Sequence, residues 1–103
     1  MDLPMIFIAF ASFPPENIKI AAKVFLTLKV LPNSVKRVGP YFKIDPDAPI
    51  EIITIYEFDP DYIDKAKKFL EARYKAFAEV PGFLVKIEAR LDMQEALLRL
   101  QLK

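Results

Sequence analysis

The chain has 103 residues, a net charge of +1, and no Cys, His or Trp. It therefore lacks disulfides, thiolate nucleophiles, imidazole catalysis and the commonest ligands of zinc, haem and iron–sulfur clusters, and we expect no cofactor or metal. The balance of 15 basic and 14 acidic residues argues against nucleic acid as a partner, because such proteins usually carry a basic excess.

The hydrophobic content and the length fit a single folded domain that covers residues 1–103. No apolar stretch reaches the roughly 20 residues that span a bilayer, because Ser12 and Pro14 interrupt the longest one. Residues 1–4 have neither the cationic lead nor the cleavage site of a signal peptide. We therefore expect a cytoplasmic protein with no membrane partner.

The first strand and the first helix follow each other directly. Residues 5–13 form a continuous run of β-branched, aromatic and small apolar residues, which is typical of a strand buried on both faces. Residues 16–31 then change to helical spacing. Pro15 suits the first turn of that helix, and Pro32 is expected to end it.

Residues 35–45 alternate loosely between apolar and polar side chains. Pro40 cannot donate a hydrogen bond to a β-ladder, so we expect an edge strand here. The alternation places two groups on opposite faces: Val38, Phe42 and Ile44 on one, and Arg37, Tyr41 and Lys43 on the other.

The second half of the chain repeats the order of strand, helix and strand. Residues 50–58 are again apolar on both sides. Residues 59–60 predict the start of a second helix, and residues 81–82 its end. Residues 83–91 alternate cleanly as a strand with one polar side. Asp92 has a glutamate three residues later, a pattern that begins a last short helix.

Two βαβ units in this order predict an α+β fold. We expect a ferredoxin-like βαββαβ antiparallel sheet of order 4-1-3-2, with two helices on one face and a short C-terminal helix. In that order the two strands that are apolar on both sides become central. The face without helices would then present five large apolar residues, or the other set of side chains from the first strand in place of its three: Ile6, Ile8, Phe10, Ile53 and Ile55.

An exposed apolar face of this size indicates an association site. A second copy related by a two-fold axis is the simplest cover, which makes the chain its own partner in a homodimer. In the alternative, the C-terminal helix folds under the sheet and covers the face in a monomer. That helix has apolar residues on more than one side, so it could instead join the interface: Leu98, Leu100 and Leu102.

The order of elements, the apolar sheet face, and residues 52–63 leading into an aromatic-rich helix and residues 80–83 (VPGF) resemble the dimeric α+β-barrel superfamily. That superfamily includes small monooxygenases of antibiotic biosynthesis, stress-responsive barrel proteins and muconolactone-isomerase-like enzymes. The resemblance covers nearly the whole chain, but only as a pattern. It implies the fold and the homodimer, and it assigns no catalytic residue.

The polar candidates for a ligand site on this face come from three strands: Tyr41, Glu51, Glu57, Lys86, Glu88 and Arg90. Glu51 and Glu57 are about 20 Å apart along one strand, which is too far for a two-carboxylate site. One interpretation is a small charged cavity between two sheets that binds a polar or anionic small molecule. The other is a rim of cross-strand ion pairs around a dry interface.

Two functions are consistent with these patterns. The first is a homodimer that binds a small molecule or a protein partner through the barrel between the sheets. The alternative is a cofactor-independent monooxygenase or isomerase with its site in the barrel cavity. In that enzyme Tyr41, Glu57 or Arg90 would orient or deprotonate the substrate.

Overall fold

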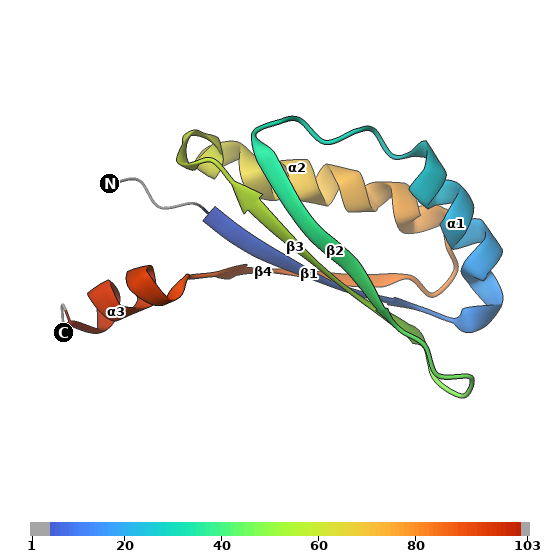
Figure 1. Cartoon of the computed structure of the whole chain (residues 1–103). Coiled ribbons are helices and arrows are strands. Elements are labelled where there is room, and N and C mark those ends of the chain that lie inside the picture. Colours follow the sequence, from blue (N-terminus) through green and yellow to red (C-terminus); the bar gives the residue numbers. More distant parts are fainter. Residues whose placement is uncertain (1–4, 102–103) are drawn as a thin grey trace.

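The computed structural model describes residues 5–101, apart from the side chains of Pro60 and Ile63. The predictions about the start of the chain and about Leu102 lie outside the described residues. In chain order the strands and α-helices are β1 (Met5–Phe13), α1 (Ile18–Thr27), β2 (Val35–Lys43), β3 (Ile50–Phe58), α2 (Ile63–Lys75), β4 (Leu84–Arg90) and α3 (Met93–Gln101) (Figure 1). Short 3-10 turns flank the helices at Pro15–Asn17, Pro60–Tyr62 and Ala76–Glu79.

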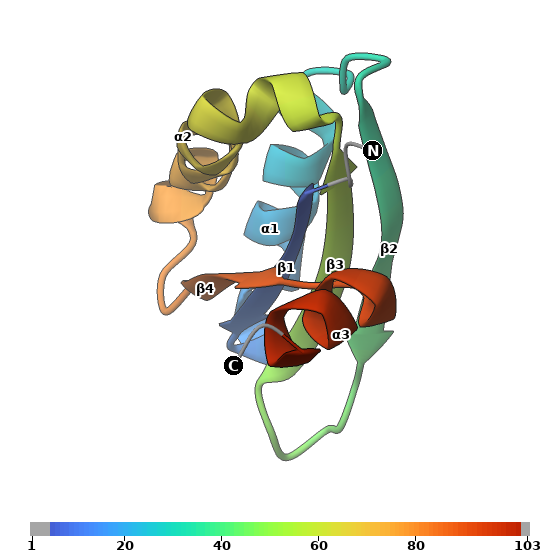
Figure 2. The same ribbon diagram turned by 90° about the vertical axis from the view of Figure 1, so that its left-hand side faces the viewer.

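The four strands form one antiparallel sheet of order β2-β3-β1-β4. This is the predicted order read from the opposite edge, so β1 and β3 are central as expected. Helices α1 and α2 both lie on one side of the sheet, as Figures 1 and 2 show. The molecule is 17 Å across in its smallest dimension. This thickness accommodates one layer of strands and one layer of helices. The fold is therefore α+β with two layers.

The core lies between the sheet and the two helices. Successive residues of a strand point to opposite faces, and one set from each central strand is buried beneath the helices: Phe7, Ala9, Ala11 and Phe13 of β1, and Ile50, Ile52, Thr54, Tyr56 and Phe58 of β3. The helices contribute small and branched residues that let them approach the sheet closely: Ala21, Val24, Ala66 and Leu70.

Aromatic rings join the layers at the end of α2. The Phe77 ring centroid lies 4.5 Å from that of Phe83, which leads into β4, and 4.9 Å from that of Phe25 on α1. Phe83 also stacks on Phe13 of β1, at 6.2 Å between centroids. Such pairs add to the stabilisation that burial provides, so this cluster fixes α1 and α2 against the sheet.

Helix α1 is shorter than predicted. The sequence predicts a helix over residues 16–31, but α1 ends at Thr27 and Leu28 is extended, with ψ at 139°. Pro32 disfavours helical geometry at Leu31, but α1 ends four residues before that position. No helix among residues 5–101 is long and apolar enough to cross a membrane.

Strand β2 contains an irregularity that the alternation does not show. Val38 pairs with Ile55 and Tyr41 pairs with Ile53, so β2 carries one more residue than β3 over this stretch. Gly39 adopts a φ of 94°, which favours glycine. The extra residue changes which side chains share a face.

This bulge corrects the predicted faces of β2. Val38 lies on the same face as Tyr41 and Lys43, because their partners on β3 all point away from the helices. Arg37 and Phe42 lie on the helix side, opposite buried residues of β3. The prediction that grouped Arg37 with Tyr41, and Val38 with Phe42, is therefore wrong.

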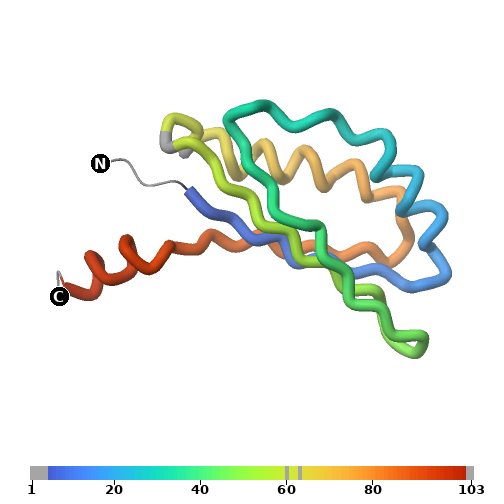
Figure 3. The backbone as a smooth tube through the Cα atoms, in the orientation of Figure 1, coloured from blue at the N-terminus to red at the C-terminus, as the bar shows by residue number. Residues whose placement is uncertain are grey.

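Helix α3 begins as predicted. The Asp92 side-chain Oδ1 accepts a hydrogen bond from the backbone N–H of Glu95 at 2.8 Å. The helix continues beyond the end of β4 instead of folding under the sheet (Figures 1 and 3), and none of its described residues is buried. The alternative in which it covers the sheet of its own chain is therefore wrong. Its apolar side chains stay exposed: Met93, Leu97, Leu98 and Leu100.

We predict that Leu70→Ala lowers the free energy of unfolding by about 2–5 kcal/mol, because it leaves a cavity under α2. Leu70 has no exposed surface, whereas Leu26 on α1 is 86% exposed. Leu26→Ala is the matched control and should change stability by less than about 0.5 kcal/mol. Urea unfolding followed by circular dichroism measures both. Equal effects of the two substitutions would contradict this account of the core.

Candidate functional site

The side of the sheet opposite α1 and α2 is the candidate site, and we call it the outer sheet face. Its residues form four rows across the strands in the order β2, β3, β1, β4: Lys36–Glu57–Ile6–Arg90, Val38–Ile55–Ile8–Glu88, Tyr41–Ile53–Phe10–Lys86, and Lys43–Glu51–Ser12–Leu84. The central rows are mostly apolar, and the charges lie at the corners and along the edges.

The centre of this face is uncovered. Phe10, Ile53 and Val38 are each more than a third exposed, although they come from three adjacent strands. The prediction that Ile6, Ile8, Phe10, Ile53 and Ile55 point away from the helices is confirmed. Burying a large apolar side chain stabilises a protein by roughly 1.5–3 kcal/mol. Covering this surface with another molecule would therefore favour association.

Three of the predicted site residues form one cluster on β4. Glu88 makes an ion pair with Lys86 at 3.0 Å and a second, shorter one with Arg90. Hydrogen bonds from Arg90 first, and then from Lys86, hold the pKa of the Glu88 carboxyl below its usual value. The Arg90 guanidinium also lies 6.0 Å from the centre of the Phe10 ring, within cation–π range. The cluster therefore borders the apolar centre.

A second group lies at the opposite edge. Lys43 on β2 and Glu51 on β3 form an exposed ion pair at 3.7 Å. Beside it, Tyr41, Phe10 and Ile53 line a shallow hollow of about 220 Å³. An exposed pair of this kind adds little to stability. The pair matters for binding, because it gives one end of this mainly aromatic and aliphatic hollow a polar character.

Glu57 stands apart from both groups. It lies at the far end of β3, between Lys36 and Ile6 in its row. The β4 cluster is two strand spacings from β3, about 10 Å. The six predicted residues therefore fall into three separate groups, and both ligand binding and a monooxygenase or isomerase activity stay predictions. Within residues 5–101, no three His, Cys, Asp or Glu residues gather as a metal site would require.

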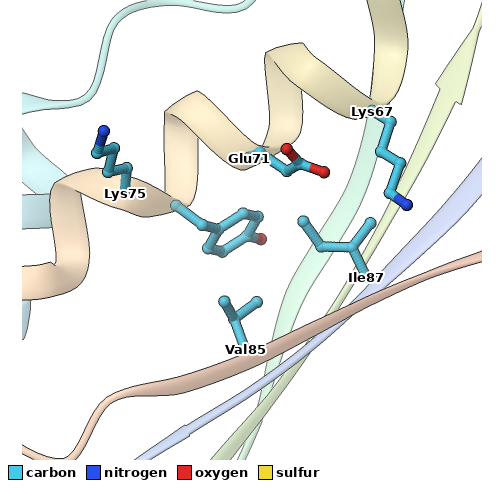
Figure 4. A pocket seen from close by; sticks show the side chains of 6 residues that line it. Lys67, Glu71, Lys75, Val85 and Ile87 are labelled. Carbon is cyan, nitrogen blue, oxygen red and sulfur yellow. The ribbon is translucent and has the colours of Figure 1, made fainter.

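The helix side holds a cleft that the sequence does not reveal. Between α2 and β4 lies an open cleft of about 400 Å³. Lys67, Glu71 and Lys75 line it from the helix, and Val85 and Ile87 line it from the strand (Figure 4). Val85 remains 39% exposed, because α2 does not extend over this edge of the sheet. Alternation marks Val85 and Ile87 as inward-facing, but it cannot show how far the helix covers them.

A buried pair of tyrosines lies beside this cleft. The Tyr56 and Tyr74 hydroxyls are 2.9 Å apart and hydrogen-bonded. Burial, and then the proximity of Tyr56, raise the pKa of Tyr74 above its usual 10.0, while Thr54 and Arg73 act in the opposite direction. The adjoining cavity is about 30 Å³, which is too small for an organic ligand. The pair is a structural hydrogen bond inside the core.

Comparison with known proteins finds no matching family model, no significantly similar curated protein and no significantly similar solved structure. The resemblance to the dimeric α+β-barrel superfamily therefore stays a prediction. The case for a function rests on the outer sheet face and its charged rim.

We predict that the protein loses stability as pH rises above about 10, and that Tyr74→Phe makes this loss shallower. The unfolded chain releases the Tyr74 proton near its usual pKa, whereas the folded chain retains it. The free energy of unfolding therefore falls by up to about 1.4 kcal/mol per pH unit from this group. Urea unfolding at several alkaline pH values measures the slope. Identical slopes for the two proteins would show that Tyr74 is not responsible.

Proposed function

We propose that the chain is a ferredoxin-like protein of the dimeric α+β-barrel type, which forms a homodimer through the outer sheet face. Between the two sheets it would hold a small, mainly apolar molecule. The observation that carries this proposal is the apolar centre of the outer sheet face, which no described helix of the chain covers.

The size of the face suits a dimer. Four strands about 4.8 Å apart, each of up to nine residues at about 3.3 Å, present on the order of 600 Å². A standard interface buries about 800 Å² on each partner. Helix α3 extends beyond the end of β4 with its apolar side chains exposed, so it can supply the remaining area.

The charges of the rim also allow two identical faces to meet. The outer sheet face carries cations and anions in nearly equal number: Lys36, Lys43, Lys86 and Arg90 against Glu51, Glu57 and Glu88. A rim of a single sign would repel its own copy, whereas a mixed rim can be complementary to itself under a two-fold axis.

The hollow beside Tyr41 supports the ligand. Phe10 and Ile53 supply an apolar surface, and the Lys43–Glu51 pair supplies a polar end. These features fit a small molecule with an aromatic or aliphatic body and one polar group. The hollow holds about 220 Å³ in one chain, less than the roughly 300 Å³ of a usual ligand pocket. A complete site therefore needs a lining from both copies.

We predict that Ile53→Glu disrupts the packing of the outer sheet faces and raises the dissociation constant of that contact at least about 100-fold, because an unpaired carboxylate would be buried in the interface. Ile18→Glu on α1 is the matched control: Ile18 is 45% exposed and Ile53 is 43% exposed. Sedimentation velocity over a range of concentrations measures the change.

The control should associate as the wild-type protein does, since Ile18 lies outside the outer sheet face. A wild-type protein that stays monomeric at high micromolar concentration would refute the dimer. So would an Ile53→Glu variant with unchanged association.

We also predict that native mass spectrometry of untreated protein shows dimers, or larger assemblies built from them, with additional bound mass. Tyr41→Trp should remove that mass, because the larger ring fills the hollow. Tyr62→Trp, at a tyrosine outside the outer sheet face, is the matched control and should retain it. Dimers of bare polypeptide mass in the wild-type protein would contradict ligand binding and leave the dimer standing.

A further inference from the structure

We propose that the free edge of β4 pairs antiparallel with β4 of a second copy, across a two-fold axis at Ile87. This contact joins two sheets edge to edge, and it is separate from the packing of outer faces. It goes beyond the proposed function and does not depend on it.

The two edge strands, β2 and β4, differ in a way that favours β4 as the edge that pairs with another strand. On β2, Pro40 has no N–H to donate and the bulge at Gly39 breaks the register. Strand β4 pairs with β1 in unbroken register from Leu84 to Arg90, without glycine or proline. No other described strand pairs with its free side. That side therefore presents a regular row of backbone donors and acceptors, which is the template for another strand.

The sequence of β4, LVKIEAR, is complementary to itself in the register that overlaps the two strands along their full length. With Ile87 on the axis, Lys86 lies opposite Glu88 of the partner subunit, and Glu88 lies opposite the partner's Lys86. Val85 then lies opposite the partner's Ala89. Opposite charges that face each other across two strands stabilise the pair, and here the two-fold axis makes the same ion pair twice.

Neighbouring registers lack this complementarity. In an antiparallel pair, directly opposite residues share a face, so the alternatives shift the axis by one residue to Lys86 or to Glu88. An axis at Lys86 places that lysine opposite its own copy. An axis at Glu88 places two glutamates together and sets Lys86 opposite the partner's Arg90. Both alternatives bring like charges together, which is destabilising.

The cleft between α2 and β4 gives the added strand a place to lie. The apolar residues that line this cleft are Val85, which is exposed, and Ile87, which is partly buried (Figure 4). In the paired register, Ile87 contacts its own copy and Val85 contacts a small alanine, so the helix side of the new seam becomes apolar. Glu71 lies between Lys67 and Lys75 along α2. The side of the helix that lines the cleft therefore carries both signs of charge and would not simply repel α2 of the partner subunit.

A charge exchange tests the register. Lys86→Glu alone and Glu88→Lys alone each place like charges opposite one another at two positions, and each should weaken the edge contact about tenfold or more. The double variant, Lys86→Glu with Glu88→Lys, restores both cross-strand pairs and should restore assembly. Sedimentation velocity measures the assembled mass, and circular dichroism confirms that these surface variants stay folded.

The same measurement in an Ile53→Glu background separates the two contacts. With the outer faces disabled, the edge contact alone should give a dimer that Lys86→Glu converts to a monomer. If the packing of outer faces does not exist, the wild-type protein is itself this edge-paired dimer. Single variants that leave the mass unchanged would overturn the proposal, and so would a double variant that fails to reassemble.

A cross-link provides a second readout. The chain has no Cys, so Ile87→Cys introduces a single thiol at the proposed axis. Directly opposite residues of antiparallel strands have Cα atoms about 4.5–5.5 Å apart, within the range that a disulfide bridges. Mild oxidation of dilute protein should link Ile87→Cys faster than Leu26→Cys, although Leu26 is far more exposed. Faster linking of the Leu26 variant would contradict the proposal.

Discussion

The one-sided cover of the sheet is the constraint on which the rest of the structure depends. Helices α1 and α2 bury one face of β1 and β3 and leave the other face to the surroundings. Both central strands are apolar on both sides, so the uncovered face carries isoleucine and phenylalanine where a lone sheet would carry polar residues. The exposure of the outer sheet face follows because, among the described residues, α1 and α2 cover the opposite side alone.

Much of the fold follows from periodicity. The bounds of β1 and β3, residues 5–13 and 50–58, agree with the apolar runs, and the central position of these strands follows from their two apolar sides. Two local features do not follow. Helix α1 ends at Thr27, before the stop that Pro32 predicts, and the faces of β2 depend on a bulge that shifts a two-residue period by one.

The candidate site divides in the same way. The grouping of Lys86, Glu88 and Arg90 follows from simple alternation along a regular strand, and the structure joins them by ion pairs. Tyr41 reaches the outer sheet face as predicted, but in the company of Val38 and not of Arg37. The cleft beside α2 depends on the lateral position of a helix over the sheet. That position is set by tertiary packing, such as the contacts of Phe77, which leaves no mark in the hydrophobic pattern.

The bulge at Gly39 and Pro40 has a consequence for the order of assembly. A sheet whose two edge strands are both regular can add further copies side by side without limit, which is how fibrils grow. Here the interrupted backbone ladder of β2 would prevent that growth. The lateral joining through β4 that we propose would therefore stop at two copies.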